Sequence, residues 1–349
     1  MVRDRRAVTS GKARVAVILA AHGEAETARF TDNFSMTRHT LAHAAEEMPI
    51  PAALRLLISL LSGLRNSREF RKTGYEPPHN AITRRQARAV AEMLDRHADA
   101  AGIAFEVFPA FSATPPFLEE VLEKTRPFDA RVMLSLSPVE NRFTCGALCR
   151  HLQDGFSGDE LAAARVVSRF WQDGALCDLY RDHLFGRFSG VNAPELSNPT
   201  LILAFHGTLV KDAKGRPPSF HTGHEETQAF ASMLKRSFEA DARNMFREVE
   251  IAYLNHDVGG EWSRPGLAEL LDGLKKRGVT DAALFAAGYF ADGNETLVRA
   301  KSILEESGLE RTVAISCIND SPAFCGFLAE RITAAAKRAA AWKSRSAAP

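Results

Sequence analysis

The sequence predicts an α/β protein of two lobes, each a parallel sheet flanked by helices, with a cleft between them. One observation behind this is an internal repeat of strands and helices, and another is that the repeated strands are apolar without alternation, as parallel strands buried on both faces are. The chain has 349 residues, more than one ordinary core needs. We expect an N-terminal lobe at 13–170, a C-terminal lobe at 171–335 and a tail at 336–349.

The first strand of each half ends in the same dipeptide. Residues 15–21 form an apolar run that leads into His22 and Gly23, and residues 200–205 form one that leads into His206 and Gly207. Short apolar runs of this kind are typical of buried parallel strands. Each histidine is therefore expected at the carboxyl end of its strand.

A second helix and strand also match between the halves, and each pair leads into a glutamate. Ligands of open α/β sheets bind beyond the carboxyl ends of the strands. We therefore expect His22, His206, Glu140 and Glu295 to face the cleft. The matching segments are helix 117–123 with strand 131–136, and helix 267–274 with strand 282–287.

Charge and cysteine content narrow the class of protein. Lys and Arg number 44 against 43 Asp and Glu, which gives no sign of a nucleic-acid partner. The start of the chain lacks the apolar run of a secretory signal, and the five cysteines indicate reduced thiols in a cytoplasmic protein. Cys145 and Cys149 are spaced to share a helix face, but an iron–sulfur cluster is not expected because no further ligands lie near them in the sequence.

Segment 48–64 is strongly apolar, but it is too short and too interrupted to span a bilayer, which takes roughly 20 apolar residues. Its two early prolines suit a loop that enters a helix. The helix is either buried, a lip over a flat hydrophobic ligand, or a surface that touches a membrane. The basic residues that follow suit anionic ligand groups, lipid head groups or plain solvent exposure.

His206 and Glu295 together suit metal chemistry. A neutral imidazole binds a divalent metal or accepts a proton near neutral pH, and a carboxylate can do either. The alternative for a histidine at a strand end is a structural role in the following loop.

Six segments carry a more specific signal. They are the apolar segment 48–64 ahead of Gly74 and Tyr75, NAITRRQA at 80–87, FHG at 205–207, EWSRP at 261–265, GYFADGNETL at 288–297 and CINDSPAF at 317–324. In these segments the chain resembles the ferrochelatase family, and the resemblance extends over about residues 13–332. It implies two Rossmann-like lobes, a porphyrin cleft, and a lyase that inserts Fe²⁺ into protoporphyrin IX or coproporphyrin III at the end of haem biosynthesis. Fe²⁺ is then a substrate, no tightly bound cofactor is expected, and the location is cytoplasmic or peripheral to a membrane through the 48–64 lip.

The resemblance also assigns roles to residues. His206 and Glu295 match the family's catalytic pair and are expected to hold the metal, with His22 as a further ligand. The expected substrate contacts are His22, Leu57, Leu60, Leu61, Tyr75, Trp262 and Asp292.

The chain departs from the family pattern near the expected reaction centre. Arg299 and Ile303 stand where acidic residues commonly follow the glutamate, and Gly293 stands where some members have histidine. His22 and Glu24 occupy a loop that usually reads Gly-Thr-Pro. These changes leave open a cobalt or nickel tetrapyrrole chelatase, since the two His-Gly strand ends also resemble the sirohydrochlorin cobaltochelatases.

Two further alternatives are a non-catalytic tetrapyrrole or haem-binding protein and a two-lobed binding protein of another kind. Additional histidines could supply metal ligands, but each is interpreted as a surface or structural residue; they are His79, His221, His224 and His256.

Overall fold

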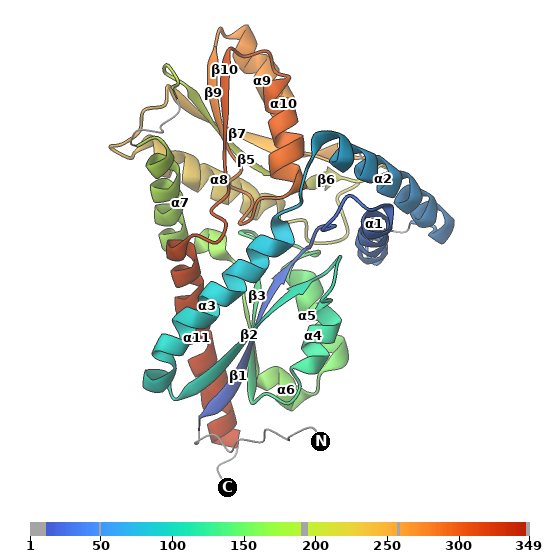
Figure 1. Cartoon of the computed structure of the whole chain (residues 1–349), viewed down its shortest axis with the longest axis vertical. Coiled ribbons are helices and arrows are strands. Elements are labelled where there is room, and N and C mark those ends of the chain that lie inside the picture. The colour runs from blue at the N-terminus through green and yellow to red at the C-terminus, as the bar shows by residue number, and fades with distance from the viewer. Residues whose placement is uncertain (1–11, 49, 190–194, 257–258, 347–349) are drawn as a thin grey trace.

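A computed structural model describes residues 12–48, 50–189, 195–256 and 259–346 and shows two lobes stacked along the long axis of the molecule (Figure 1). The first sheet has the order β2-β1-β3-β4, with every neighbouring pair parallel. Residues 1–11, Pro49 and residues 347–349, which belong to the expected N-terminus, lip and tail, lie outside the described part. The strands of this sheet are β1 (Ala13–Ala21), β2 (Ile103–Phe111), β3 (Ala130–Ser135) and β4 (Ala164–Val167).

The second sheet repeats this arrangement. Its order is β10-β9-β5-β7, again with parallel neighbours. When the four strands of each sheet are numbered in chain order within their own lobe, both sheets have the spatial order 2-1-3-4. The internal repeat therefore includes the sheet topology, and the expected fold class is confirmed. The strands are β5 (Thr200–His206), β7 (Glu248–Leu254), β9 (Asp281–Phe285) and β10 (Arg311–Ile315).

Helices cover both faces of each sheet, as expected for parallel strands joined by helical crossovers. A short antiparallel sheet of two strands, β6 (Leu209–Lys211) and β8 (Glu261–Trp262), lies beside the second sheet. A π-helical turn, Glu295–Ala300, runs directly into α10 (Lys301–Glu305). The other helices are α1 (Phe30–Ala45), α2 (Ala52–Thr73), α3 (His79–Ala101), α4 (Leu118–Lys124), α5 (Cys145–Gly155), α6 (Gly158–Ala162), a 3₁₀ turn (Phe170–Gln172), α7 (Gly174–Arg187), α8 (His224–Glu239), α9 (Leu267–Lys276) and α11 (Pro322–Ser346).

Helix α11 returns from the second lobe to the first, where it packs against α3, β3 and β4 (Figure 1). Small residues at helical spacing let it approach the sheet closely, and Ala336 and Ala339 are fully buried. The expected tail at 336–349 is therefore helical up to Ser346 and contributes to the core. The expected boundary near residue 170 lies between the two sheets. Helix α11 lies after this boundary in the sequence but packs against the first lobe.

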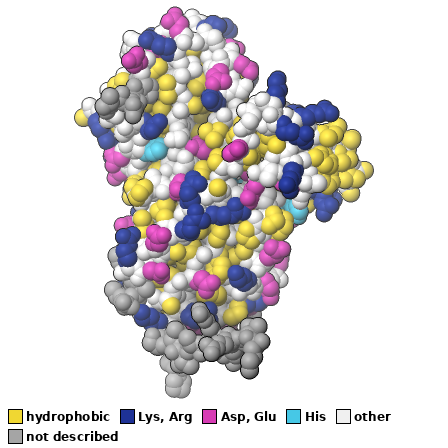
Figure 2. Space-filling view, viewed as in Figure 1, with side chains coloured by type: hydrophobic (Ala, Val, Ile, Leu, Met, Phe, Trp, Pro, Cys, Tyr) yellow, Lys and Arg dark blue, Asp and Glu magenta, His cyan; other side chains and the backbone are white. Residues whose placement is uncertain are grey.

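Helix α2 pairs with α1, and its apolar side faces away from the pair. At the contact, a Cβ on Gly63 would lie 3.1 Å from the Phe34 backbone, so glycine lets the helices meet closely. Leu57, Leu60 and Leu61 are 51%, 38% and 59% exposed. Figure 2 shows hydrophobic side chains at the right edge of the molecule, where Figure 1 places α2, with Lys and Arg beside them. Of the alternatives for segment 48–64, the buried helix is excluded.

Among the described helices, none is long and apolar enough to cross a membrane.

The packing of α11 predicts the outcome of a matched pair of substitutions. Ala336→Asp places an unpaired carboxylate between α11 and the first sheet, and we expect it to lower the free energy of unfolding by about 3 kcal/mol or more. Lys337→Asp, next to it on the exposed side, should change it by less than about 0.5 kcal/mol. Urea denaturation followed by circular dichroism measures both, and equal small effects would mean that α11 does not pack on the sheet.

Candidate metal and tetrapyrrole site

The carboxyl end of β5 is held close to the end of β7. A Cβ on Gly207 would lie 2.8 Å from the Asn255 Cα and 2.9 Å from the Leu254 carbonyl oxygen, so no larger residue fits there. The amide of Gly207 donates to that carbonyl at 3.0 Å. The His-Gly dipeptide thus lets the strand end, and the His206 side chain on it, approach the loop after β7.

The His206 ring is oriented by the backbone carbonyl of the next residue, Gly207. Its Nδ1 lies 2.7 Å from the Gly207 carbonyl oxygen, and because a carbonyl can only accept, Nδ1 carries the proton. In the neutral ring, Nε2 then presents a lone pair, and a hydrogen bond of this kind commonly orients metal-binding histidines. The side chain is 45% exposed to solvent.

His256 meets His206 from the neighbouring strand. His206 pairs with Leu254 in the β5–β7 register, which places His256 two residues beyond the paired end. The two Nε2 atoms are 3.1 Å apart, and the His256 ring packs edge-on against Trp262 at 5.4 Å. The sequence interpretation of His256 as a surface or structural residue missed this contact.

Glu295 completes the cluster from a third segment. It begins the π-helical turn, a distortion that is frequent at functional sites. Its carboxylate accepts a 2.7 Å hydrogen bond from the Tyr289 hydroxyl. Burial acts to raise the pKa of Glu295, but His206, His256, the Tyr289 hydrogen bond and Arg299 together outweigh it and hold the pKa below its usual range. Glu295 is therefore an anion at neutral pH.

These three side chains have the spacing of a metal site. Their ligand atoms all lie within 4.8 Å of one another, with Glu295 oxygens 3.9 Å from His206 Nε2 and 3.7 Å from His256 Nε2. Donors bound at 2.0–2.2 Å to a tetrahedral cation lie roughly 3.3–3.6 Å apart, so small side-chain shifts would seat a divalent ion. Two imidazoles and a carboxylate suit a first-row transition metal better than Mg²⁺ or Ca²⁺.

His22 faces this cluster from the first lobe. It follows β1, and its Nε2 lies 3.3 Å from the Thr40 hydroxyl. Desolvation by its surroundings and the nearby His79 lower its pKa to about 4, while Glu295 acts to raise it, so the ring is neutral at pH 7. The residue as a whole is exposed to solvent. His22 lies outside the three-residue cluster, and its role as a metal ligand stays a prediction.

Glu24 is a buried carboxylate at the junction of the lobes. Its Oε1 accepts hydrogen bonds from the Tyr75 hydroxyl at 3.0 Å and from the Asn294 amide at 2.9 Å. Burial raises its pKa to about 7, although both hydrogen bonds act to lower it. Glu24 and Tyr75 thus meet beside the segment that carries Glu295.

Other residues expected to act at the site have different surroundings. The Asp292 carboxylate is buried and accepts from Thr296, Cys317 and Asn319, an arrangement that suits holding the loop rather than touching a ligand. Glu140 accepts from Trp171 and pairs with Arg169. A direct role for Asp292 in substrate binding remains a prediction.

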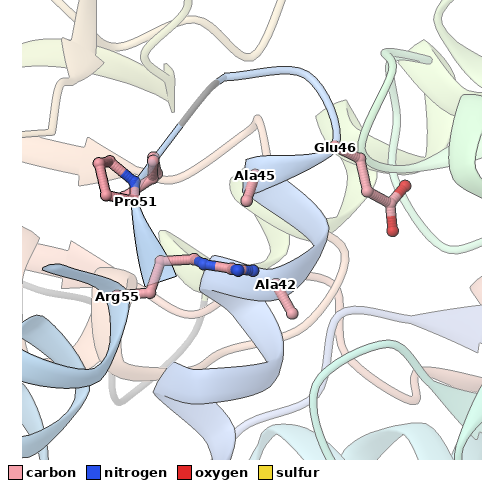
Figure 3. A pocket seen from close by; sticks show the side chains of 6 residues that line it. Ala42, Ala45, Glu46, Pro51 and Arg55 are labelled. Carbon is pink, nitrogen blue, oxygen red and sulfur yellow. The ribbon is translucent and has the colours of Figure 1, made fainter. Parts of the chain in front are cut away.

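An open cavity of about 400 Å³ lies elsewhere, between the end of α1 and the start of α2 (Figure 3). Its lining is mainly apolar, and the Arg55 side chain extends across it toward Ala42. The metal-binding cluster does not line this cavity. The candidate metal site therefore rests on the side chains at the strand ends rather than on this hollow.

The family model and the curated relatives that match this chain have the same description. The family model described as Ferrochelatase matches residues 14–336. A ferrochelatase of Synechococcus elongatus is 23% identical over 299 residues, covering 82% of this chain and 73% of its own. One from Picosynechococcus sp. is 25% identical over 297 residues, covering 80% and 71%. Among solved structures, SirB from Bacillus subtilis with Fe³⁺ aligns over 96% of this chain and 98% of its own, with 12% identity and a TM-score of 0.47.

The raised pKa of Glu24 predicts a pH-dependent stability difference. Because the folded-state pKa of about 7 exceeds the ordinary value of 4.5, the stability that Glu24 contributes in acid is lost as the pH rises through 7. Relative to wild type, Glu24→Gln should gain about 2 kcal/mol in free energy of unfolding between pH 5 and pH 8. His22 and His79 are present in both proteins, so their titration cancels to first order.

Urea denaturation at the two pH values measures this difference. Glu26→Gln is the matched control, because Arg84 lowers the pKa of Glu26 and that exposed carboxylate stays ionised over this range. A difference between Glu24→Gln and wild type that does not change with pH would contradict the shift.

Proposed function

Because the chain belongs to the ferrochelatase family, we propose that it inserts a divalent metal ion, Fe²⁺, into a porphyrin, either protoporphyrin IX or coproporphyrin III. The observation that carries the proposal is the convergence of His206, His256 and Glu295, whose ligand atoms lie within 4.8 Å of one another. Fe²⁺ is then a substrate that these side chains receive and release. The porphyrin is the partner in the cleft, and the proposal includes a cytoplasmic location.

Metallation needs two actions that this cluster supports. The entering ion must exchange bound water for ring nitrogens, and the ring must lose two N–H protons. His206, whose Nδ1 is engaged by the Gly207 carbonyl and whose Nε2 is turned away from that contact, is the proposed proton acceptor. Anionic Glu295 and His256 hold the ion, and a ring distorted by the cleft would expose its nitrogen lone pairs to it.

The proposed ring contacts come from both lobes. Trp262 packs against His256, and His22 lies across the cleft. Leu57, Leu60 and Leu61 present an unusual apolar surface on α2, which we assign to the porphyrin. Contact of the same surface with a membrane is the alternative.

A second candidate function has its own supporting observation. The cluster holds two imidazoles, and nitrogen ligands bind Co²⁺ and Ni²⁺ more tightly than Fe²⁺. This favours a cobalt or nickel tetrapyrrole chelatase as the alternative.

The test is anaerobic metallation of protoporphyrin IX and coproporphyrin III with Fe²⁺, Co²⁺ and Ni²⁺, followed by absorbance. We expect Fe²⁺ turnover, and a loss of about 100-fold or more in His206→Ala because proton transfer and a metal ligand are both removed. His221→Ala is the control, since His221 is exposed and pairs with Glu226 outside the cluster.

Each other outcome has a clear meaning. Turnover with Co²⁺ or Ni²⁺ but not Fe²⁺ would support the alternative chelatase. Porphyrin binding without turnover for any ion would indicate a tetrapyrrole-binding protein instead. Full activity in His206→Ala would show that the proposed proton acceptor is wrong.

A further inference from the structure

One carboxylate oxygen joins three parts of the molecule that are far apart in the sequence. Oε1 of Glu24, in the loop after β1, accepts from the Tyr75 hydroxyl, which follows α2, and from the Asn294 amide. Asn294 directly precedes Glu295 in the second lobe. A single acceptor thus connects the first lobe, the leucine-bearing helix and the start of the metal-binding turn.

Glu24 is itself rigidly held in the first lobe. Its amide donates to Asn80 Oδ1 at 2.9 Å, and Asn80 Nδ2 donates to its carbonyl oxygen at 3.0 Å. Asn80 lies at the start of α3 and is 1% exposed. The carboxylate therefore cannot follow a movement of the second lobe without breaking these bonds or the bond to Asn294.

Burial of the Glu24 carboxylate at this position is unfavourable for the stability of the fold. The residue is only 8% exposed, and its Oε2 has no hydrogen-bond partner within the described part of the chain. A buried carboxylate oxygen without a partner is unfavourable. Gly293 lies directly against it, because a Cβ there would be 3.4 Å from Oε2. Residues whose placement is unfavourable for the stability of the fold are expected at functional sites.

We propose that Glu24 is a positioning residue that fastens the Glu295-bearing turn to the first lobe and, through Tyr75, to α2. Its two hydrogen bonds hold the Glu295 carboxylate within reach of His206 and His256. The inference rests on the proposed function, since it concerns the same metal-binding cluster.

The test measures metal affinity rather than activity. Co²⁺ is titrated into the full chain at pH 7.5 and followed by its visible absorption, which reports the ligand set. Glu24→Ala should weaken binding about 10–100-fold, the effect typical of removing an outer partner of a metal ligand. Glu24→Gln should stay within about threefold of wild type, because its amide oxygen can accept both hydrogen bonds.

Two further variants isolate the cause. Asn294→Pro removes the amide donor, and its φ of −54° suits proline, so it should reproduce the loss with Glu24 intact. Asp320→Ala is the control, because it breaks a different exposed contact between the same parts, the ion pair with Arg85. It should leave Co²⁺ affinity unchanged.

The outcomes separate the inference from the proposed function. Wild-type affinity in Glu24→Ala, or a Glu24→Gln as weak as Glu24→Ala, would overturn the positioning role. A wild-type protein whose Co²⁺ spectrum and affinity do not depend on His206 and His256 would overturn the metal site itself.

Discussion

The close approach of backbone segments at the edge of the second sheet determines the geometry of the site. Gly207 lies against Asn255, and a Cβ on Gly288 would lie 2.7 Å from the Phe205 Cα. Glycine at both positions lets the ends of β5, β7 and β9 meet with no side chains between them. His206, His256 and Glu295 converge because the segments that carry them are pressed together in this way, and the cleft chemistry follows from that contact.

Much of this arrangement was predictable from the sequence, because it depends on strand pattern. The apolar runs with their His-Gly ends predicted two parallel sheets, and the segments around His206 and Glu295 pointed to the same edge of the second sheet. His256 was named only as one of several possible ligands and was interpreted as a surface or structural residue, since it lies two residues past its strand in a loop without a pattern of its own. The parallel register between β5 and β7 was the available signal, because it places residues after both strands side by side.

Tertiary contacts add what the sequence pattern does not contain. Glu140 matches Glu295 in the repeat, and in the fold its carboxylate accepts from Trp171 and pairs with Arg169. Two of the departures from the family pattern lie close to the cluster. Arg299 donates to the carbonyl of Asn255, next to His256, and Gly293 lies beside the Glu24 carboxylate. Ile303, in contrast, packs against the hydrophobic core of the second lobe.

The path of α11 has a consequence for how the protein is made. This helix covers the first sheet, yet it follows every strand of both sheets, and β1, which it touches, precedes them all. During synthesis on a ribosome, the N-terminal lobe must wait with part of its sheet uncovered until the second lobe and α11 have emerged. The second lobe has its own complete sheet by then, so it is the lobe that can fold first, reversing the usual order in which domains form from the N-terminus.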